Sequence, residues 1–204
     1  MMDPLDQTIT TYREHFSKYV ERTPQEPGGE FMDWMNAFAE CVQKQGRILE
    51  LGSAFGRDAR YFAKKGFRMM CTDVIPQALA QLKDEGFETA AFDFRDPPKP
   101  EWVEAFDGCF ANAVLLHASR DVFVRAVEHM ILIVKENGII AFSLKAGEGE
   151  LVTLEKMDAP RYFCYHTEAE VRSILAAMPV ELIRISQADN GKWLQVIAKK
   201  NRKG

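Results

Sequence analysis

The regular alternation of short apolar segments with amphipathic ones, between residue 47 and about residue 178, constrains the fold of this chain most. Apolar runs such as 47–52 and 67–73 have the length of buried strands, and the segments after them repeat apolar residues every three or four positions, which is the period of a helix. This alternation predicts a parallel sheet with helices on both faces. Two last strands, 180–186 and 192–200, are joined by a link too short for a crossover, so we expect them to pair antiparallel.

We therefore expect an α/β protein with a doubly wound sheet of seven strands, mostly parallel, with an antiparallel C-terminal hairpin strand and two N-terminal helices. The helices are expected over residues 4–20 and 30–44, and residues 146–166 are expected to be irregular. Because no linker divides the chain, we expect a single domain over residues 1–204. Residues 1–45 would form a helical cap or lid on a core of residues 46–204.

Composition excludes several classes of function. The net charge of −4 gives no reason to expect a nucleic-acid backbone as partner, since phosphate neutralisation needs a basic patch; a local patch is the alternative. The polar, acidic N-terminus is unlike a signal peptide, and no apolar run approaches the 18 or so residues that span a bilayer. The four cysteines, Cys41, Cys71, Cys109 and Cys164, form no close pair. We expect reduced thiols, no metal, no nucleic-acid or membrane partner, and a cytoplasmic location.

The first strand runs directly into a glycine-rich turn, Gly-Ser-Ala-Phe-Gly, with Glu50 just before it. A strand that ends in glycines and continues as a helix leaves backbone N–H groups exposed toward a ligand. Gly52 can take the sharp turn, and Gly56 lets the helix pack closely. The alternative is that both are ordinary turn glycines, because a glycine-rich turn alone is a weak motif.

Acidic residues end the next two strands. Asp73 stands twenty-one positions after Gly52, where an acid can accept hydrogen bonds from both hydroxyls of a ribose. Asp93, followed by Phe94, offers a carboxylate for an exocyclic amine beside an aromatic ring. Asp73 could instead be a helix cap, and Asp93 could belong to a solvated loop. Since the carboxyl ends of parallel strands share one edge, the three strand ends together predict a nucleoside site.

With these motifs the chain resembles the class I S-adenosylmethionine-dependent methyltransferases, from about residue 46 to the last strand. "ILELGSAFGRDA" resembles the first motif of that family, "CTDVIP" its ribose motif and "AAFDF" its adenine motif. "FDGCFANAVLLH" and "LIVKENGIIAFSLKAGEGE" resemble the motifs of its fourth and fifth strands. The resemblance implies a Rossmann-like fold and S-adenosylmethionine as cofactor. One position departs from the family pattern, because Ala54 replaces the middle glycine of the first motif.

The resemblance also implies roles for individual residues. Arg57 and Asp58 would lie by the methionine end of the cofactor, and Val74 would pack on the adenine. Tyr12 and Tyr19 would form a lid, the alternative being plain packing. The implied cofactor-binding residues are Glu50, Gly52, Ser53, Ala54, Gly56, Arg57, Asp58, Asp73, Val74, Asp93, Phe94, Asn112, Ala113, Tyr12 and Tyr19.

The sulfonium of this cofactor is an activated methyl donor, so the protein has mainly to align an in-line displacement and to exclude water. A general base is needed only if the acceptor carries a proton at neutral pH. His117, after the fourth strand, is the candidate catalytic base, and the alternative is a histidine that anchors its loop by a hydrogen bond.

The acceptor should contact segments outside the nucleotide motifs. These mix charge with aromatic surface, and the candidate substrate-binding residues are Lys145, Arg161, Tyr162, Tyr165, His166 and Trp193. We expect a small-molecule acceptor, with anions among the candidates. In the alternative, Glu148, Glu150 and Lys156 are ordinary solvated loop charges. We expect a monomer or a homodimer, and the accepting atom stays open.

Two other functions compete with methyl transfer. A nicotinamide-dependent oxidoreductase on a related fold should carry Gly-x-Gly-x-x-Gly after the first strand, and the sequence there, Gly-Ser-Ala-Phe-Gly-Arg, does not fit. A non-catalytic adenosyl-binding module would keep the fold as a scaffold or sensor, and Ala54 slightly favours it.

Overall fold

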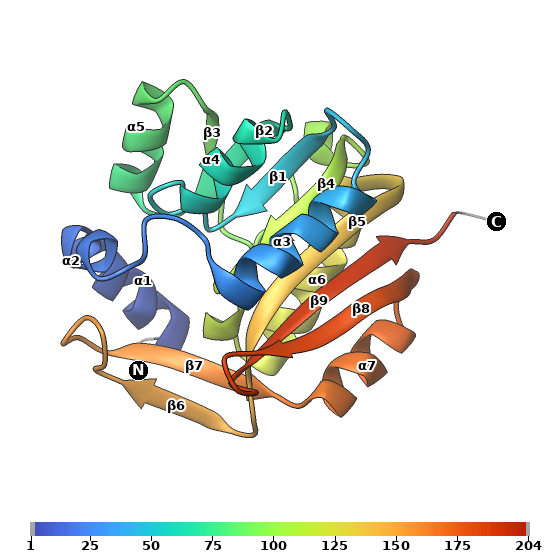
Figure 1. Cartoon of the computed structure of the whole chain (residues 1–204). Helices are drawn as coiled ribbons and strands as arrows, with labels where there is room; N and C mark the ends of the chain where they lie inside the picture. The colour runs from blue at the N-terminus through green and yellow to red at the C-terminus, as the bar shows by residue number, and fades with distance from the viewer. Residues whose placement is uncertain (1–2, 203–204) are drawn as a thin grey trace.

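The computed structural model describes residues 3–202, which form one sheet flanked by helices (Figure 1). The helices are α1 (Pro4–Glu14), α2 (Phe16–Glu21), α3 (Gly29–Cys41), α4 (Arg57–Lys64), α5 (Pro76–Asp84), α6 (Arg120–Ile133) and α7 (Glu168–Ala176), with 3-10 turns at Pro100–Trp102 and Leu115–His117. The strands are β1 (Arg47–Leu51), β2 (Arg68–Asp73), β3 (Glu88–Ala91), β4 (Phe106–Ala111), β5 (Val134–Ala146), β6 (Glu150–Thr153), β7 (Arg161–His166), β8 (Val180–Ala188) and β9 (Trp193–Lys200).

The strand order confirms the predicted α/β class. Strands β3, β2, β1, β4 and β5 lie side by side in that order, and each neighbouring pair is parallel. Strand β9 pairs antiparallel with β5, and β8 pairs antiparallel with β9, as the short link between them predicted. The chain moves outward from β1 to β3 and then crosses back to β4. Strand order therefore reverses between β1 and β4, and a doubly wound sheet binds ligands beyond the carboxyl ends of the strands at this point.

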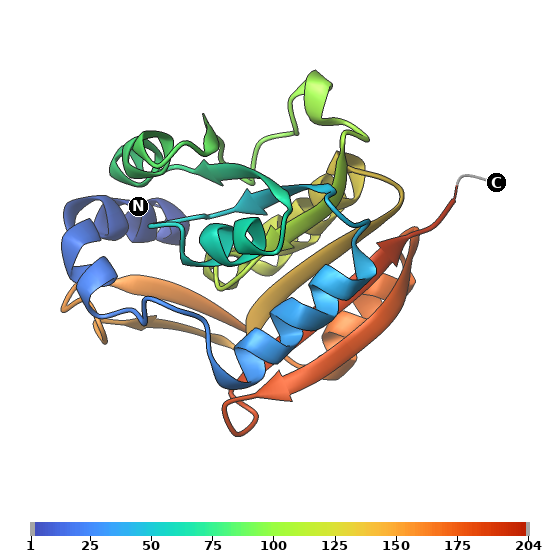
Figure 2. The same ribbon diagram turned by 45° about the horizontal axis from the view of Figure 1, so that its top comes forward.

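The central strands β1 and β4 are buried on both faces because helices cover each side. On one face, Ile48 packs with α3 and α4 through residues such as Phe38 and Phe62. On the other, Leu49 packs with α6 and α7 through residues such as Phe123. Neighbours along a strand point to opposite faces, so adjacent residues of β1 belong to different clusters. Figure 2 shows α3 along one face of the sheet, and no helix among residues 3–202 is long and apolar enough to cross a membrane.

The segment predicted to be irregular, residues 146–166, instead contains the antiparallel hairpin of β6 and β7. The sheet over residues 3–202 therefore has nine strands, where the sequence predicted seven. Residue Lys145 of β5 pairs with Trp193 of β9 on one edge and with Tyr165 of β7 on the other. Because β4 occupies that second edge only as far as Ala111, β7 continues the sheet beyond the carboxyl end of β4. This placement carries the hairpin to the edge where the site was predicted.

The N-terminal region contains three helices, because the helix predicted over residues 4–20 breaks at His15, whose φ and ψ are −117° and 26°. Helix α1 lies against the hairpin in both ribbon views (Figures 1 and 2). The Thr11 hydroxyl donates to the Pro160 carbonyl at 2.7 Å, and the Tyr162 N–H donates to the Thr8 hydroxyl at 2.9 Å. These bonds fix the N-terminal helix across the open ends of the strands, where a cap was expected.

Candidate functional site

Two adjoining pockets open at the carboxyl ends of the strands. Pocket A lies under α1 beside β2 and β3 and encloses about 750 Å³ of empty space, part of it open to solvent. Pocket B lies beside the β1–α4 loop and encloses about 920 Å³ of empty space, part of which is also open to solvent. Residues Tyr19, Gly52, Ala54, Asn112 and Ala113 line both. The pockets therefore meet at the carboxyl ends of β1 and β4, and together they are large enough for a cofactor and a small second ligand.

The β1–α4 loop needs both of its glycines. Gly52 has φ +66°, and a Cβ atom there would lie 2.6 Å from Val114 Cγ2. Gly56 has φ +84°, and a Cβ atom there would lie 2.3 Å from Leu82 Cδ2. Ala54, which replaces the usual glycine, also has a positive φ of +48°. An alanine tolerates this conformation at a cost of about 1 kcal/mol, so the loop keeps its shape despite the substitution.

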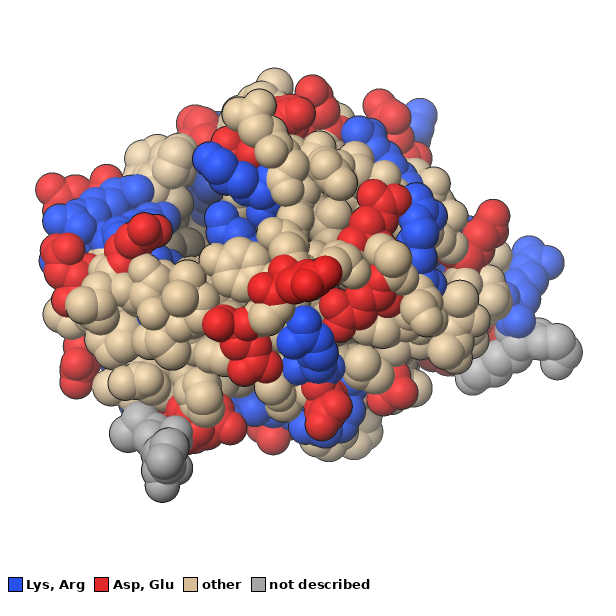
Figure 3. Space-filling model, turned by 90° about the horizontal axis from the view of Figure 1, so that it is seen from below, with Lys and Arg blue, Asp and Glu red and all other residues tan. Residues whose placement is uncertain are grey.

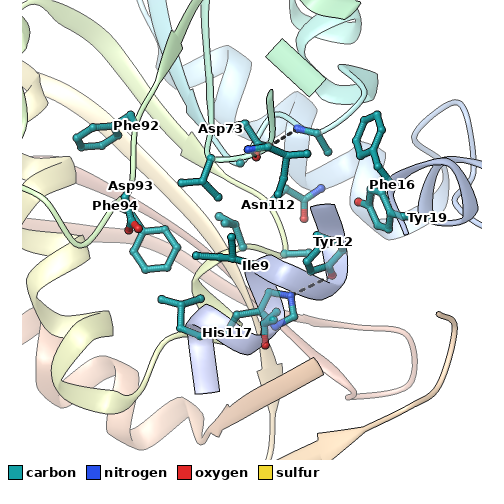
Figure 4. A pocket seen from close by; sticks show the side chains of 18 residues that line it. Ile9, Tyr12, Phe16, Tyr19, Asp73, Phe92, Asp93, Phe94, Asn112 and His117 are labelled. Atoms are coloured by element: carbon teal, nitrogen blue, oxygen red, sulfur yellow. Dashed lines mark hydrogen bonds between the residues drawn. The ribbon is translucent and has the colours of Figure 1, made fainter. Parts of the chain in front are cut away.

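Asp73, at the end of β2, holds this loop in place. One carboxylate oxygen accepts from the Ala54 N–H at 2.8 Å (Figure 4), and the other accepts from the Ile75 N–H at 2.9 Å. Burial raises the pKa of Asp73, and these backbone hydrogen bonds oppose the rise. The bond to Ile75 closes a turn before α5, whose N-cap is Ile75 and has no side-chain cap, so Asp73 is not the helix cap of the alternative interpretation. A carboxylate has about four acceptor sites, which leaves capacity for a ribose.

Asp93 occupies the same pocket with different partners. Its carboxylate accepts from Arg95 Nε at 3.1 Å and from Arg95 Nη2 at 2.7 Å, and Arg95 Nη1 lies 2.8 Å from Asp6 Oδ1. Arg95 therefore ties the end of β3 to α1, a role that the sequence analysis did not predict. Phe94 and Val74 line pocket A and supply apolar walls suited to a flat ring.

A chain of hydrogen bonds positions Asn112 after β4. Its amide nitrogen donates to Asp58 at 2.7 Å, and its amide oxygen accepts from the Ser143 hydroxyl at 2.7 Å. Arg57 binds the same Asp58 through Nε at 2.6 Å, and the Ala113 N–H donates to Ser143 at 2.8 Å. Ser143 was missed in the sequence, although it is the polar residue within the apolar run of β5. The network fixes the point where the pockets meet.

Glu50 is buried at the base of the loop and lines pocket B. Its Oε2 atom has no hydrogen-bond partner. Burial, and then the negative charge of Asp58, raise the pKa of Glu50. A buried acceptor without a partner costs free energy, and a ligand that donates a hydrogen bond there recovers it. The Ser53 hydroxyl, 3.4 Å from the Glu50 carbonyl, belongs to the same turn.

His117 lines pocket A, but both of its ring nitrogens already have hydrogen-bond partners in the protein. Its Nδ1 lies 2.6 Å from the Tyr162 carbonyl, so Nδ1 carries the hydrogen and donates it. Nε2 then accepts from the Tyr12 hydroxyl at 3.1 Å (Figure 4), and that hydroxyl accepts from Arg161 Nη1 at 3.1 Å. Burial lowers the pKa of His117 to about 4, so the ring is neutral at pH 7. The geometry is that of the anchoring alternative, and a proton from a ligand would reach His117 through Tyr12. Its role as a base stays a prediction.

The predicted lid and substrate residues lie at different distances from the pockets. Tyr12 and Tyr19 pack edge-to-face at 5.1 Å and both line pocket A. Trp193 lines pocket B, whereas Lys145, Arg161, Tyr162, Tyr165 and His166 line neither pocket. His166 is fully buried against Phe123, with Nδ1 3.4 Å from Glu170 Oε1. Alternate residues of a strand face opposite ways, so Arg161 faces Tyr12 and Tyr162 points away.

Comparison with known proteins finds a family model that matches part of the chain. Residues 49–142 match the family model described as "Methyltransferase domain". No curated protein matches the chain. Its fold resembles an S-adenosylmethionine-dependent methyltransferase from Methanosarcina mazei, with 14% identity, a TM-score of 0.70, and coverage of 82% of this chain and 98% of that one.

Two further solved structures cover nearly the whole chain. One is 1,6-didemethyltoxoflavin-N1-methyltransferase from Burkholderia thailandensis with bound 1,6-didemethyltoxoflavin and S-adenosylhomocysteine, at 18% identity, TM-score 0.69, and coverage of 99% and 92%. The other, from Rhodobacter sphaeroides, is named after the Zn-dependent alcohol dehydrogenases, at 11% identity, TM-score 0.76, and coverage of 100% of both chains. At these identities the likeness shows the fold alone. Residues 3–202 contain no group of three His, Cys, Asp or Glu that could hold a metal ion.

The chain thus carries a methyltransferase domain with the class I fold, and the resemblance in its sequence is confirmed. S-adenosylmethionine is the cofactor of this class, and methylation that depends on it is the activity that these findings support. They name no acceptor.

Proposed function

We propose that this protein transfers the methyl group of S-adenosylmethionine to a small-molecule acceptor by in-line displacement. The observation that carries the proposal is the junction of the two pockets at Asn112 and Ala113. Pocket A ends there with the features of a nucleoside site, and pocket B continues from the same point toward solvent. A donor that extends from pocket A across this junction would meet there an acceptor that occupies the remaining part of pocket B.

The residues of both pockets fit the cofactor. In pocket A, Asp73 is available to the ribose hydroxyls, and Val74 and Phe94 offer apolar walls for the adenine. In pocket B, the unpartnered oxygen of Glu50 suits the ammonium group of the methionine end, and Arg57 suits its carboxylate. The cofactor, when bound, supplies a methyl group on a sulfonium, which needs no further activation.

The protein's own contribution is to align the two molecules and to exclude water. Asn112 is held from both sides by Asp58 and Ser143, so its position is fixed before any ligand arrives. Tyr12 and Tyr19, on α1 and α2, cover the same point from the other side. Such preorganisation lowers the entropic part of a displacement barrier by several kcal/mol. Tyr12 and His117 together can take up a proton if the acceptor must lose one.

The proposal is tested by titration calorimetry with S-adenosylhomocysteine, S-adenosylmethionine and NADH, followed by incubation with a methyl-labelled donor and a metabolite panel. We expect both adenosyl compounds to bind, NADH not to bind, and label to move into a small molecule. Binding of NADH alone would replace methyl transfer with the oxidoreductase function. Tight adenosyl binding with no transfer to any acceptor would support the non-catalytic module instead.

A further inference from the structure

Positive charge gathers at the outer end of pocket B. The view from below shows Lys and Arg side chains beside a hollow in this face (Figure 3). Lys156 lines the pocket, with Nζ 4.7 Å from the centre of the Tyr19 ring. Burial, followed by the positive charges of Arg161 and Arg57, lowers the pKa of Lys156 to about 8. Three cationic side chains therefore share one partly buried region.

The carboxylates that line pocket B already have partners or are neutral. Of the acidic residues that line pocket B, Asp58 binds Arg57, Glu26 lies 3.3 Å from Lys64 Nζ, and burial raises the pKa of Glu50. No ion pair among residues 3–202 includes Lys156 or Arg161. A cation at a partly buried site normally has a counter-charge, so this region lacks negative charge.

The lack of a negative counter-charge is clearest at Arg161. The residue is only 7% exposed, and its hydrogen bonds go to neutral groups, the Tyr12 hydroxyl and the Glu155 carbonyl. Its Nε has no partner. Removing a guanidinium from water without a counter-charge costs several kcal/mol. An anion beside Lys156 would offset that cost, because Arg161 is close enough for its positive charge to lower the pKa of Lys156.

The loop that carries Lys156 is held rigidly enough to form a site. Arg22 Nη1 donates to the Lys156 carbonyl at 2.7 Å, and Arg161 Nη2 donates to the preceding carbonyl at 2.7 Å. The following residue, Met157, is completely buried. The Lys156 ammonium therefore projects from a fixed backbone, unlike the solvated loop charge that the sequence allowed as an alternative.

Aromatic side chains form the wall next to these cations. Trp193 and Phe31 line pocket B and pack edge-to-face at 5.3 Å. Lys145 Nζ lies 3.9 Å from the centre of the Trp193 ring. This wall can cover an apolar or flat surface, while the cations beside it select negative charge.

We infer that the methyl acceptor is an anion, whose carboxylate or phosphate group binds at Lys156 with Arg161 behind it and whose body lies against Trp193. The inference rests on the proposed function and adds the class of substrate. The accepting atom would reach inward to the junction at Asn112, at the end of the molecule away from the anionic group. The carboxylate of the cofactor is a second anion that would suit Lys156, but we assign that carboxylate to Arg57.

The test uses phenyl phosphate and benzoate as anionic probes and benzyl alcohol and benzylamine as their neutral and cationic counterparts. Each is added to the protein saturated with S-adenosylhomocysteine, and binding is followed by ligand-observed NMR. We expect the anions to bind and the other two not to bind. Lys156→Met should weaken anion binding about tenfold or more, and Lys156→Arg should retain it. Lys44→Met, an exposed lysine elsewhere, is the control of equal charge and should change nothing.

A second measurement distinguishes the anionic group of the acceptor from the carboxylate of the cofactor as the ligand of Lys156. Lys156→Met should leave the Kd of S-adenosylhomocysteine within about threefold of the wild type, because the cofactor carboxylate is assigned to Arg57. A large loss of S-adenosylhomocysteine affinity would assign Lys156 to the cofactor and overturn the inference. Failure of both anions to bind, or equal binding to wild type and Lys156→Met, would also overturn it. Absence of methyl transfer together with anion binding at Lys156 would contradict the proposed function alone.

Discussion

Pockets A and B share one wall but satisfy their charged groups in opposite ways. In pocket A, the carboxylates of Asp73 and Asp93 already accept hydrogen bonds from the protein. In pocket B, Glu50 has an oxygen without a partner, and Lys156 has no carboxylate partner among residues 3–202. Pocket A is thus preorganised by its own contacts, whereas pocket B holds an unpartnered oxygen of Glu50 and the positive charge of Lys156, unpaired in the part of the chain that the structure describes, both of which a ligand can satisfy.

The difference suits the two kinds of ligand proposed. A nucleoside is neutral and needs fixed walls and a few hydrogen bonds. The methionine end of the cofactor and an anionic acceptor carry charge, and buried charges without partners in the protein favour their binding. Substitutions in pocket A should therefore affect the protein by altering the shape of the site. Substitutions in pocket B should affect it by altering charge, and their effects should depend on pH.

The largest effect is expected at Asp73 in pocket A. Asp73→Ala removes the acceptor for the Ala54 and Ile75 N–H groups and the predicted partner of the ribose. We expect the affinity for S-adenosylhomocysteine to fall by about 2–4 kcal/mol, measured by calorimetry. Asp84→Ala, on the exposed side of α5, is the matched control and should bind normally. An unchanged Kd for Asp73→Ala would show that pocket A is not organised by this carboxylate.

The next effect tests the charge of pocket B through Glu50. Its pKa is raised above the ordinary value of 4.5, chiefly by burial, so the folded state binds the proton more tightly than the unfolded state. Its contribution to stability is full below pH 4.5 and is lost as the pH rises through the raised pKa. Glu50→Gln cannot ionise, so its stability relative to the wild type should increase by about 1–3 kcal/mol toward alkaline pH. Urea unfolding of both proteins from pH 5 to pH 9 measures this, and parallel curves would contradict it.

His117, at the border of pocket A, should show the opposite dependence on pH. Burial lowers its pKa from 6.5 to about 4, so the unfolded state binds the proton more tightly. Stability from this group is full above pH 6.5 and is lost as the pH falls toward 4. His117→Asn should be less stable than the wild type at neutral pH, because the hydrogen bonds to Tyr12 and to the Tyr162 carbonyl change. On acidification, its free energy of unfolding should fall by about 1–2 kcal/mol less than that of the wild type. Equal acid losses in both proteins would place the titrating group elsewhere.

Most of the fold followed from the sequence because local patterns determine it. The alternation of strands and helices gave the parallel sheet, and the short link before Trp193 gave the antiparallel pair. The hairpin of β6 and β7 did not follow. Its edge strand is largely exposed and so carries no strict alternation, and β7 finds its place only through pairing with the distant β5. The break at His15 likewise lies within a helical pattern.

In the candidate site, too, local features could be predicted from the sequence and long-range contacts could not. Asp73 and Gly52 were found because they stand at strand ends, where position in the chain determines position in space. Ser143 and Arg95 were not, because their partners are remote: Ser143 binds Asn112 thirty-one positions away, and Arg95 binds Asp6 on α1. His117 was found, but its neutral, doubly bonded state depends on Tyr12, which is 105 positions away. Local spacing predicts which residues are present and not how their hydrogen bonds are shared.

The smallest effect is expected at Asp93, and it tests whether pocket A holds the adenine as it holds the ribose. Because Arg95 already binds both oxygens of Asp93, a bond to the adenine amine would add little, and Asp93→Ala should weaken S-adenosylhomocysteine binding by only about 1 kcal/mol. Loss of the anchor between β3 and α1 could produce a similar change, so the affinity alone does not separate the two causes. S-inosylhomocysteine, which lacks the exocyclic amine, does separate them. If Asp93 accepts from the amine, the wild type prefers the adenosyl compound and Asp93→Ala loses that preference. If Asp93 only anchors α1 through Arg95, both compounds weaken equally, and the carboxylates of pocket A differ in role as well as in strength.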